Sequence, residues 1–274
     1  MNIVYIDSLF LPELEPYRTM RRPVEHRAKG IFVAEGEKVV RRLLESELRT
    51  VSILMSPEWL ERYRDILSIK MIKQGVFIAE KALLDQIVGY NLHQGIMAIG
   101  RVPEPLDIFK AVEEFPKPCL LVAADGIANS ENMGVIVRNC AAFGVQLLIS
   151  GETSCDPYLR RSVRNSMGTI FNLPVANVED LSVTLKRLRK QLSFEIVAAH
   201  PQSDSIELNE ANLTKDDCVV FGSEGEGISR NVLNECTVRV KIPMDNDVDS
   251  INVASSVGVV LYAVSRQRKK FVEI

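Results

Sequence analysis

The sequence lacks any long hydrophobic run. None of its apolar stretches approaches the ~18 residues that a membrane-spanning helix needs. Residues 1–7 also lack the basic-then-apolar order of a signal peptide. Because 46% of the 274 residues are hydrophobic, the chain can bury a large core, and we expect a soluble globular protein in the cytoplasm.

Paired cysteines are absent as well. The cysteines are odd in number and show no C-x-x-C spacing, so neither a disulfide framework nor a zinc site is indicated. We expect them to be reduced and mostly buried: they are Cys119, Cys140, Cys155, Cys218 and Cys236. His26 and His200 have no neighbours at a spacing that indicates a metal site or a general base, and we assign no metal.

A surplus of positive charge is the third missing feature. The 33 lysines and arginines are outnumbered by 36 acidic residues, which excludes a protein that coats nucleic acid through its overall charge. Two local clusters are candidates for RNA contacts, although a cluster of charges is usually a solvated surface. They are Arg18, Arg21, Arg22, Arg27 and Lys29 near the N-terminus, and Arg160, Arg161 and Arg164 in the middle.

Short apolar runs alternate with helical periodicity along the chain, which predicts two α/β domains. The first half has such runs at 31–34, 51–54, 76–79 and 95–100. The second half has the continuously apolar runs of buried parallel strands at 120–124, 145–149, 194–199 and 218–221. A proline-bracketed polar stretch separates them. We therefore expect an N-terminal domain over 1–103, a linker over 104–117 and a second domain over 118–274.

The last expected helix has two distinctive features. Its apolar stripe is expected to pack on the sheet or on a partner subunit. The stripe consists of Val253, Val257, Val260, Leu261 and Val264. Cations gather at the end of this helix, where we expect them to offset the helix dipole: they are Arg266, Arg268, Lys269 and Lys270.

Three loops of the second domain place small or polar residues where a strand ends and a helix begins. They cover residues 129–138, 221–229 and 242–253. Ligands of open α/β sheets bind at the carboxyl ends of the strands, so the three loops can line one pocket.

The middle loop reads F-G-S-E-G-E-G-I-S from Phe221. A phosphate-binding loop would need a lysine and no competing carboxylate, whereas Glu224 and Glu226 would repel an anion. This disfavours a nucleotide hydrolase. The glycines let the backbone turn sharply or approach a ligand, and that ligand is expected to be neutral or cationic, such as a sulfonium. An ordinary turn between strand and helix is the alternative.

The order of the motifs resembles that of one enzyme family. N-x-G-x-I-x-R begins at Asn132, G-S-E-G-x-G at Gly222 and I-P-M at Ile242, followed by S-I-N-V from Ser250. The series looks like the three signature motifs of the SpoU (TrmH) family, within the SPOUT class of RNA methyltransferases, over roughly residues 118–268. Residues 32–37 and 93–96 are similar to the small substrate-binding domain that often precedes it.

The resemblance implies a trefoil-knotted, parallel-sheet α/β methyltransferase domain behind a small α/β RNA-binding domain. It also implies a homodimer, S-adenosylmethionine as the methyl donor, and methylation of a ribose 2′-hydroxyl in ribosomal or transfer RNA. An RNA-binding assembly factor with the same fold and little or no turnover remains the alternative.

Carried over residue by residue, the resemblance implies catalytic roles for Arg138, Asn132, Glu224, Ser250 and Asn252. It implies donor binding by Gly222, Ser223, Gly225, Ile242, Met244, Ile251 and Val253. From the basic clusters we expect RNA contacts at Arg160, Arg161, Arg164, Arg21 and Arg22.

Some of these residues have structural alternatives. Arg138 could be an ion-pair partner, and Asn132 and Asn252 could cap helices. As a guanidinium stays protonated, we expect Arg138 to hold a phosphate and a developing alkoxide rather than to act as a base. Asn246 stands where many family members have glycine; asparagine tolerates a positive φ, but its side chain could narrow the donor pocket.

Overall fold

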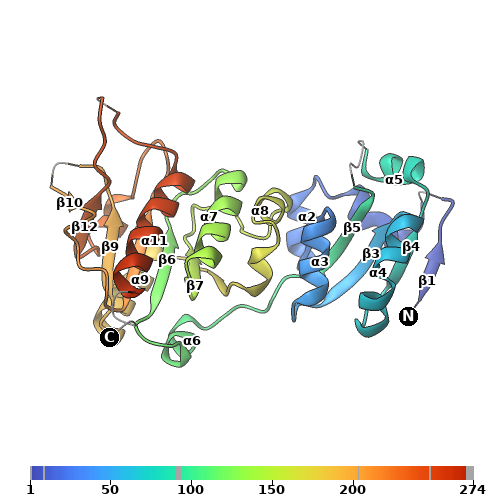
Figure 1. Cartoon of the computed structure of the whole chain (residues 1–274), viewed down its shortest axis with the longest axis horizontal. Coiled ribbons are helices and arrows are strands. Elements are labelled where there is room, and N and C mark those ends of the chain that lie inside the picture. The colour runs from blue at the N-terminus through green and yellow to red at the C-terminus, as the bar shows by residue number, and fades with distance from the viewer. Residues whose placement is uncertain (1, 9, 90–93, 203, 247, 270–274) are drawn as a thin grey trace. The chain divides into compact units, whose positions relative to one another are not determined.

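The computed structural model describes residues 2–8, 10–89, 94–202, 204–246 and 248–269. The chain forms two compact units (Figure 1). The first comprises Met1–Glu104 and Tyr158–Asn172, and the second comprises Pro105–Pro157 and Leu173–Ile274. Within the described residues, no helix is both long and apolar enough to span a membrane.

The first unit is built on a five-stranded mixed sheet in the order β1-β4-β3-β5-β2. Its strands are β1 (Ile3–Tyr5), β2 (Ile31–Glu35), β3 (Thr50–Met55), β4 (Gly75–Ile78) and β5 (Ile96–Arg101). Its helices are η1 (Pro12–Leu14), α1 (Glu15–Arg18), α2 (Pro23–Ala28), α3 (Glu37–Glu45), α4 (Pro57–Ile69), α5 (Lys81–Val88), α8 (Arg160–Asn165) and η2 (Thr169–Asn172). Strand β5 runs antiparallel to both β2 and β3, so the carboxyl ends of β2 and β3 lie at the edge where β5 begins.

The second unit is built on a seven-stranded sheet, all of whose pairings are parallel, in the order β10-β12-β9-β11-β6-β7-β8. Its strands are β6 (Leu120–Ala124), β7 (Leu147–Ser150), β8 (Val175–Asn177), β9 (Glu195–Ala199), β10 (Ile206–Glu207), β11 (Asp217–Phe221) and β12 (Val238–Lys241). Its helices are α6 (Ile108–Glu114), α7 (Ser130–Ala142), α9 (Leu181–Leu192), α10 (Arg230–Leu233) and α11 (Val253–Lys269).

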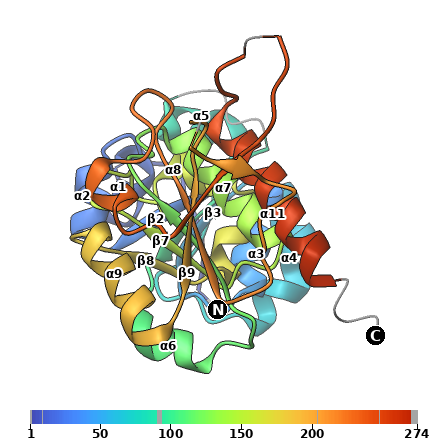
Figure 2. The same ribbon diagram turned by 90° about the vertical axis from the view of Figure 1, so that its left-hand side faces the viewer.

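Helices cover both faces of this sheet, with α9 on one face and α7 and α11 on the other (Figure 2). The central strands β6 and β11 are therefore buried along their whole length, which explains their continuously apolar sequences. The α/β fold with a parallel sheet agrees with the expected one. The trefoil knot implied by the resemblance stays a prediction.

The boundaries of the two units differ from the expected domains. The stretch 104–117 contains helix α6, whose Ile108 and Val112 are buried in the core of the second unit. The segment Tyr158–Asn172 packs in the first unit, where the rings of Tyr158 and Phe171 lie 5.4 and 5.3 Å from that of Phe32. Apolar periodicity shows that a segment is buried but does not say in which core.

The apolar stripe of α11 is buried within the chain, where α11 packs against α7. At their crossing the Asn139 amide donates to the Ala254 carbonyl at 2.8 Å. Other apolar side chains of the two helices remain exposed, namely Val135 (37%), Val259 (42%) and Tyr262 (58%). The stripe therefore stabilises the subunit itself, and any contact with a second copy would use these other residues.

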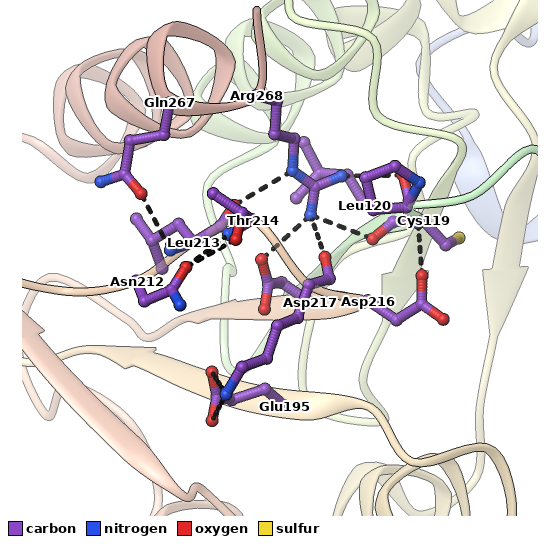
Figure 3. A network of polar contacts seen from close by, with 12 residues as sticks. Cys119, Leu120, Glu195, Asn212, Leu213, Thr214, Asp216, Asp217, Gln267 and Arg268 are labelled. Carbon is purple, nitrogen blue, oxygen red and sulfur yellow. Dashed lines mark hydrogen bonds and ion pairs between the residues drawn. The ribbon is translucent and has the colours of Figure 1, made fainter. Parts of the chain in front are cut away.

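The end of α11 is attached to the amino-terminal edge of the sheet through Arg268 (Figure 3). Its guanidinium donates to the carboxylate of Asp217 at 3.0 Å, and to the carbonyls of Pro118, Cys119, Leu213 and Lys215 at 2.6–3.1 Å. Arg268 therefore does more than offset the helix dipole, because these acceptors belong to β11 and to the segments that enter β6 and β11. Lys270 lies outside the described residues.

Candidate active site

Three residues from the three motifs meet beside the carboxyl ends of β6, β11 and β12. The Asn252 amide donates to Glu224 Oε1 at 2.6 Å, and the Asn132 amide donates to the same oxygen at 3.2 Å. Asn252 also donates to Asn132 Oδ1 at 3.2 Å, which closes a triangle of side chains. We call Asn132, Glu224 and Asn252 the polar triangle.

Local helix capping explains part of this geometry. Asn129, not Asn132, caps α7 by accepting a hydrogen bond from the Glu131 N–H at 2.8 Å. Asn252 accepts from the Ala254 N–H at 3.0 Å where α11 begins, so it fixes that helix terminus and takes part in the polar triangle at once. The capping alternative therefore holds for Asn252 but not for Asn132.

The glycines of the middle loop have different roles. A Cβ at Gly222 would lie 2.1 Å from the carbonyl carbon of Gly227, so only glycine fits there. Gly227 has a φ of +71°, and Ser223 and Gly227 exchange two backbone hydrogen bonds of 3.0 Å that close the turn. Gly225 faces open space. The loop is thus a tight hairpin whose shape depends on Gly222 and Gly227.

A cleft of about 790 Å³ opens beside this hairpin, within the 300–1,000 Å³ range typical of small-molecule sites. All seven residues expected to bind the donor line it: Gly222, Ser223, Gly225, Ile242, Met244, Ile251 and Val253. Glu224 and Ser250 line it too, so the polar triangle borders the cleft through Glu224. Asn246 does not line it and has a φ of +58°, in the left-handed region.

The cleft has further walls that sequence reasoning missed. The segment after β9 contributes His200, Pro201 and Gln202, and the strands β10 and β12 contribute Glu207 and Lys241. The sequence signal that could have indicated these walls is the end of the apolar run 194–199, because this strand also ends at the same edge of the sheet. Four lining residues are acidic (Glu207, Glu224, Glu226 and Asp249) and one is a lysine, so the cleft favours a cationic ligand.

Arg138 lies on α7, six residues after Asn132, or about 9 Å further along the helix axis. Its side chain is exposed and makes no hydrogen bond or ion pair with any residue that the structure describes. The structural alternative of an ion-pair partner therefore has no support within the described ranges. Ser250 is exposed at the rim of the cleft.

The arginines expected to contact RNA all belong to the first unit, not to the unit with the polar triangle. Glu35, whose side chain is only 6% exposed, binds Arg160 Nη1 at 2.6 Å and Arg164 Nη1 at 3.3 Å. Arg161, Arg21 and Arg22 are exposed, and Arg22 pairs with Glu25 at 3.1 Å.

The cysteines are free, and Cys119, Cys140 and Cys218 are buried. Burial raises the pKa of the Cys119 thiol to about 11, so this thiol stays protonated at neutral pH. Among the residues with described positions, no three histidines, cysteines or carboxylates are grouped to hold a metal ion.

Comparison with known proteins places this geometry in a family. Residues 119–262 match the SpoU rRNA methylase family. An uncharacterized tRNA/rRNA methyltransferase of Mycobacterium tuberculosis is 31% identical over 264 residues, which cover 93% of this chain and 89% of that protein.

Two solved structures share the fold at lower identity. The AdoMet-bound rRNA methyltransferase from Sinorhizobium meliloti has a TM-score of 0.80 at 21% identity, covering 96% of this chain and 98% of that one. An RNA 2′-O ribose methyltransferase has a TM-score of 0.77 at 24% identity, covering 98% and 100%. Together with the motif residues around the cleft, these matches show that the chain belongs to the SpoU rRNA methylase family, whose members methylate RNA with S-adenosylmethionine.

Proposed function

We propose that the protein transfers a methyl group from S-adenosylmethionine to a ribose 2′-hydroxyl of ribosomal or transfer RNA in the cytoplasm. The observation that carries this proposal is the polar triangle at the border of the cleft. The relatives described as tRNA/rRNA methyltransferases and the neighbour described as an RNA 2′-O ribose methyltransferase support it. We further propose that the first unit selects the RNA and the second unit holds the donor.

The cleft fits the donor in size and charge. Bound there, S-adenosylmethionine would supply a methyl group activated by the sulfonium. The hairpin around Gly222 and the loop from Ile242 to Val253 would hold it, and the acidic lining would favour its positive charge.

The chain's own groups then position the acceptor. Both hydrogen bonds from the asparagines reach Oε1 of Glu224, and no described residue hydrogen-bonds its Oε2. Oε2 is therefore oriented to accept a hydrogen bond from a ribose hydroxyl, whose proton leaves to Glu224, to the adjacent phosphate or to water. Arg138 would hold that phosphate and stabilise the oxygen as it loses its proton. Alignment by these groups lowers the barrier by several kcal/mol.

Transfer of labelled methyl groups to RNA tests the proposal. A methylated 2′-oxygen blocks alkaline cleavage of the neighbouring phosphodiester, so the label should appear in dinucleotides after alkaline hydrolysis. Label in mononucleotides would indicate base methylation and refute the ribose assignment. RNA binding without any transfer would favour the assembly factor instead.

Gly222→Ala should weaken S-adenosylmethionine binding by ~10-fold or more, because the added Cβ collides with the Gly227 backbone and must reshape the hairpin. Isothermal calorimetry measures the affinity. Gly258→Ala on α11 is the matched control, since Gly258 does not line the cleft and its Cβ would meet only the Asn139 amide at an ordinary 3.5 Å, so this variant should bind as the unmodified protein does. Tight binding of ATP with no binding of S-adenosylmethionine would contradict the donor assignment.

We also propose a homodimer formed through α7 and α11, with the same face of each copy in contact. The exposed Val135, Val259 and Tyr262 motivate it, because they add an apolar surface to helices that already cover the sheet. Tyr262→Lys should shift the protein from dimer to monomer in light scattering at micromolar concentration. Val183→Lys on α9, at a valine 51% exposed, should leave it dimeric. An unmodified protein that is monomeric and fully active would refute the dimer.

A further inference from the structure

Trp59, the chain's single tryptophan, lies in the first turn of α4 and is partly exposed. Its indole N–H donates to the backbone carbonyl of Gln94, and its ring forms a T-shaped pair with that of Tyr63 at a centroid distance of 5.7 Å. The Gln94 side chain in turn accepts from the Glu37 N–H at 2.7 Å. These contacts hold the indole in one orientation. Because the ring is only partly buried, fixing it in this way adds little to the stability of the fold.

Guanidinium groups accompany this ring. Arg62 places its guanidinium carbon 5.0 Å from the ring centroid, and its side chain is 59% exposed while it pairs with Glu58. Across the sheet edge, Glu35 is shared by two arginines, of which Arg164 is 58% exposed. Because most of its side chain is exposed, the Arg164 guanidinium is accessible to a phosphate.

The topology of the first sheet brings these groups to one edge. Trp59 follows the end of β3, Gln94 precedes the start of β5, and Glu35 is the last residue of β2. These strands are adjacent in the order β3-β5-β2, so the ends of β3 and β2 are about 10 Å apart. We call Trp59, Arg62, Glu35, Arg160 and Arg164 the aromatic rim.

We propose that the aromatic rim binds a single-stranded segment of the RNA substrate, with an unpaired base stacked on Trp59 and a phosphate near Arg164. Single-stranded RNA is recognised by aromatic rings and guanidinium planes, onto which its exposed bases stack. Double-stranded RNA offers no free base face. The inference rests on the proposed RNA methyltransferase function and adds to it the class of RNA that the first unit takes.

The charges of the rim decide which interaction dominates. Arg62 is paired with Glu58, and the exposed Arg164 shares Glu35 with Arg160. We therefore expect one or two phosphate contacts, and a slope of about −0.7 to −1.4 for log affinity against log salt. Stacking on Trp59 should supply most of the affinity.

Intrinsic fluorescence tests this directly, because Trp59 is the only tryptophan. A single-stranded uridine octanucleotide should quench it in a saturable manner, and an RNA duplex at equal nucleotide concentration should not. Absent quenching by an octanucleotide that binds, or equal quenching by the duplex, would overturn the proposal.

Variants provide an independent measurement by anisotropy of a dye-labelled octanucleotide. Trp59→Leu should weaken binding by ~10-fold or more, and Trp59→Phe, which keeps a stacking ring, by at most ~3-fold. Arg64→Gln on the same helix is the control, since Arg64 is exposed and pairs only with Glu61 among the described residues. Wild-type binding by Trp59→Leu would refute the site.

Methyl transfer separates this inference from the proposed function. In Trp59→Leu the KM for bulk ribosomal and transfer RNA should rise, while kcat and the affinity for S-adenosylmethionine stay unchanged. A quenched Trp59 in a protein that never methylates RNA would refute the proposed function and leave the binding site standing. Normal methylation of RNA with an unquenched Trp59 would refute the binding site alone.

Discussion

Arg138→Ala is expected to lower the rate of RNA methylation by ~10²-fold or more and to leave the affinity for S-adenosylmethionine nearly unchanged. This is the scale on which loss of one electrostatic stabiliser slows a reaction. The exposed guanidinium has no partner among the described residues and does not line the donor cleft, so its removal should affect the acceptor and not the donor. Single-turnover transfer of labelled methyl groups, together with calorimetry of donor binding, measures both quantities.

Two further variants sharpen this prediction. Arg138→Lys should restore little activity, because an ammonium cannot bind phosphate and alkoxide through two parallel hydrogen bonds. Arg230→Ala, at another exposed arginine of the second unit, should retain the full rate. If Arg138→Ala instead loses donor binding, or methylates normally per folded molecule, then Arg138 has a structural role and the mechanism must be abandoned.

Arg268→Ala is expected to lower the free energy of unfolding by about 3–5 kcal/mol, the usual cost of leaving one member of a buried ion pair alone. The Asp217 side chain is fully buried, and its Oδ1 already lacks a hydrogen-bond partner within the described parts of the chain. Four backbone carbonyls each lose the hydrogen bond from Arg268 at the same time. Urea unfolding followed by circular dichroism measures the loss, and Arg266→Ala on the same helix should stay within about 0.5 kcal/mol.

The pH dependence of the free energy of unfolding should identify Asp217 as the cause of this loss. Burial raises the pKa of its carboxyl to about 6, since Arg268 offsets only part of the cost of desolvation. A raised pKa means that the folded chain binds the proton more tightly than the unfolded chain. This group therefore lowers stability as pH rises from about 4 to about 6, by about 3 kcal/mol in total, and has no further effect above that window.

In Arg268→Ala the pKa of Asp217 in the folded state rises further. The difference in unfolding free energy between this variant and the unmodified protein should therefore grow from pH 5 to pH 8. Asp217→Asn cannot ionise and leaves Arg268 its four carbonyl acceptors, so it should cost about 1 kcal/mol or less at pH 7 and lose this pH dependence. A loss of unfolding free energy in Arg268→Ala that is below about 1 kcal/mol, or that is independent of pH, would show that the ion pair with Asp217 does not stabilise the position of α11.

Features that depend on local sequence could be predicted without coordinates. The apolar runs at β6 and β11 mark central strands, because only a strand covered on both faces is apolar at every position. The glycines and carboxylates of the hairpin indicate its turn and its preference for a cation, and an asparagine at position 246 is compatible with the observed positive φ. The seven residues expected to bind the donor were named from the family resemblance; they line the cleft, and their role in donor binding stays a prediction.

Contacts between distant parts of the chain could not be predicted in this way. Asn132 and Asn252 are 120 residues apart, and Arg160 and Glu35 are 125 apart. The sequence by itself determined the α/β fold, the motif loops and the family. The tertiary structure alone decided that Tyr158–Asn172 belongs with the first unit, that Arg268 holds Asp217, and that two asparagines share one oxygen of Glu224. The physical reason is that periodicity and turn chemistry act over a few neighbouring residues, whereas these pairings depend on where the folded backbone brings remote segments together.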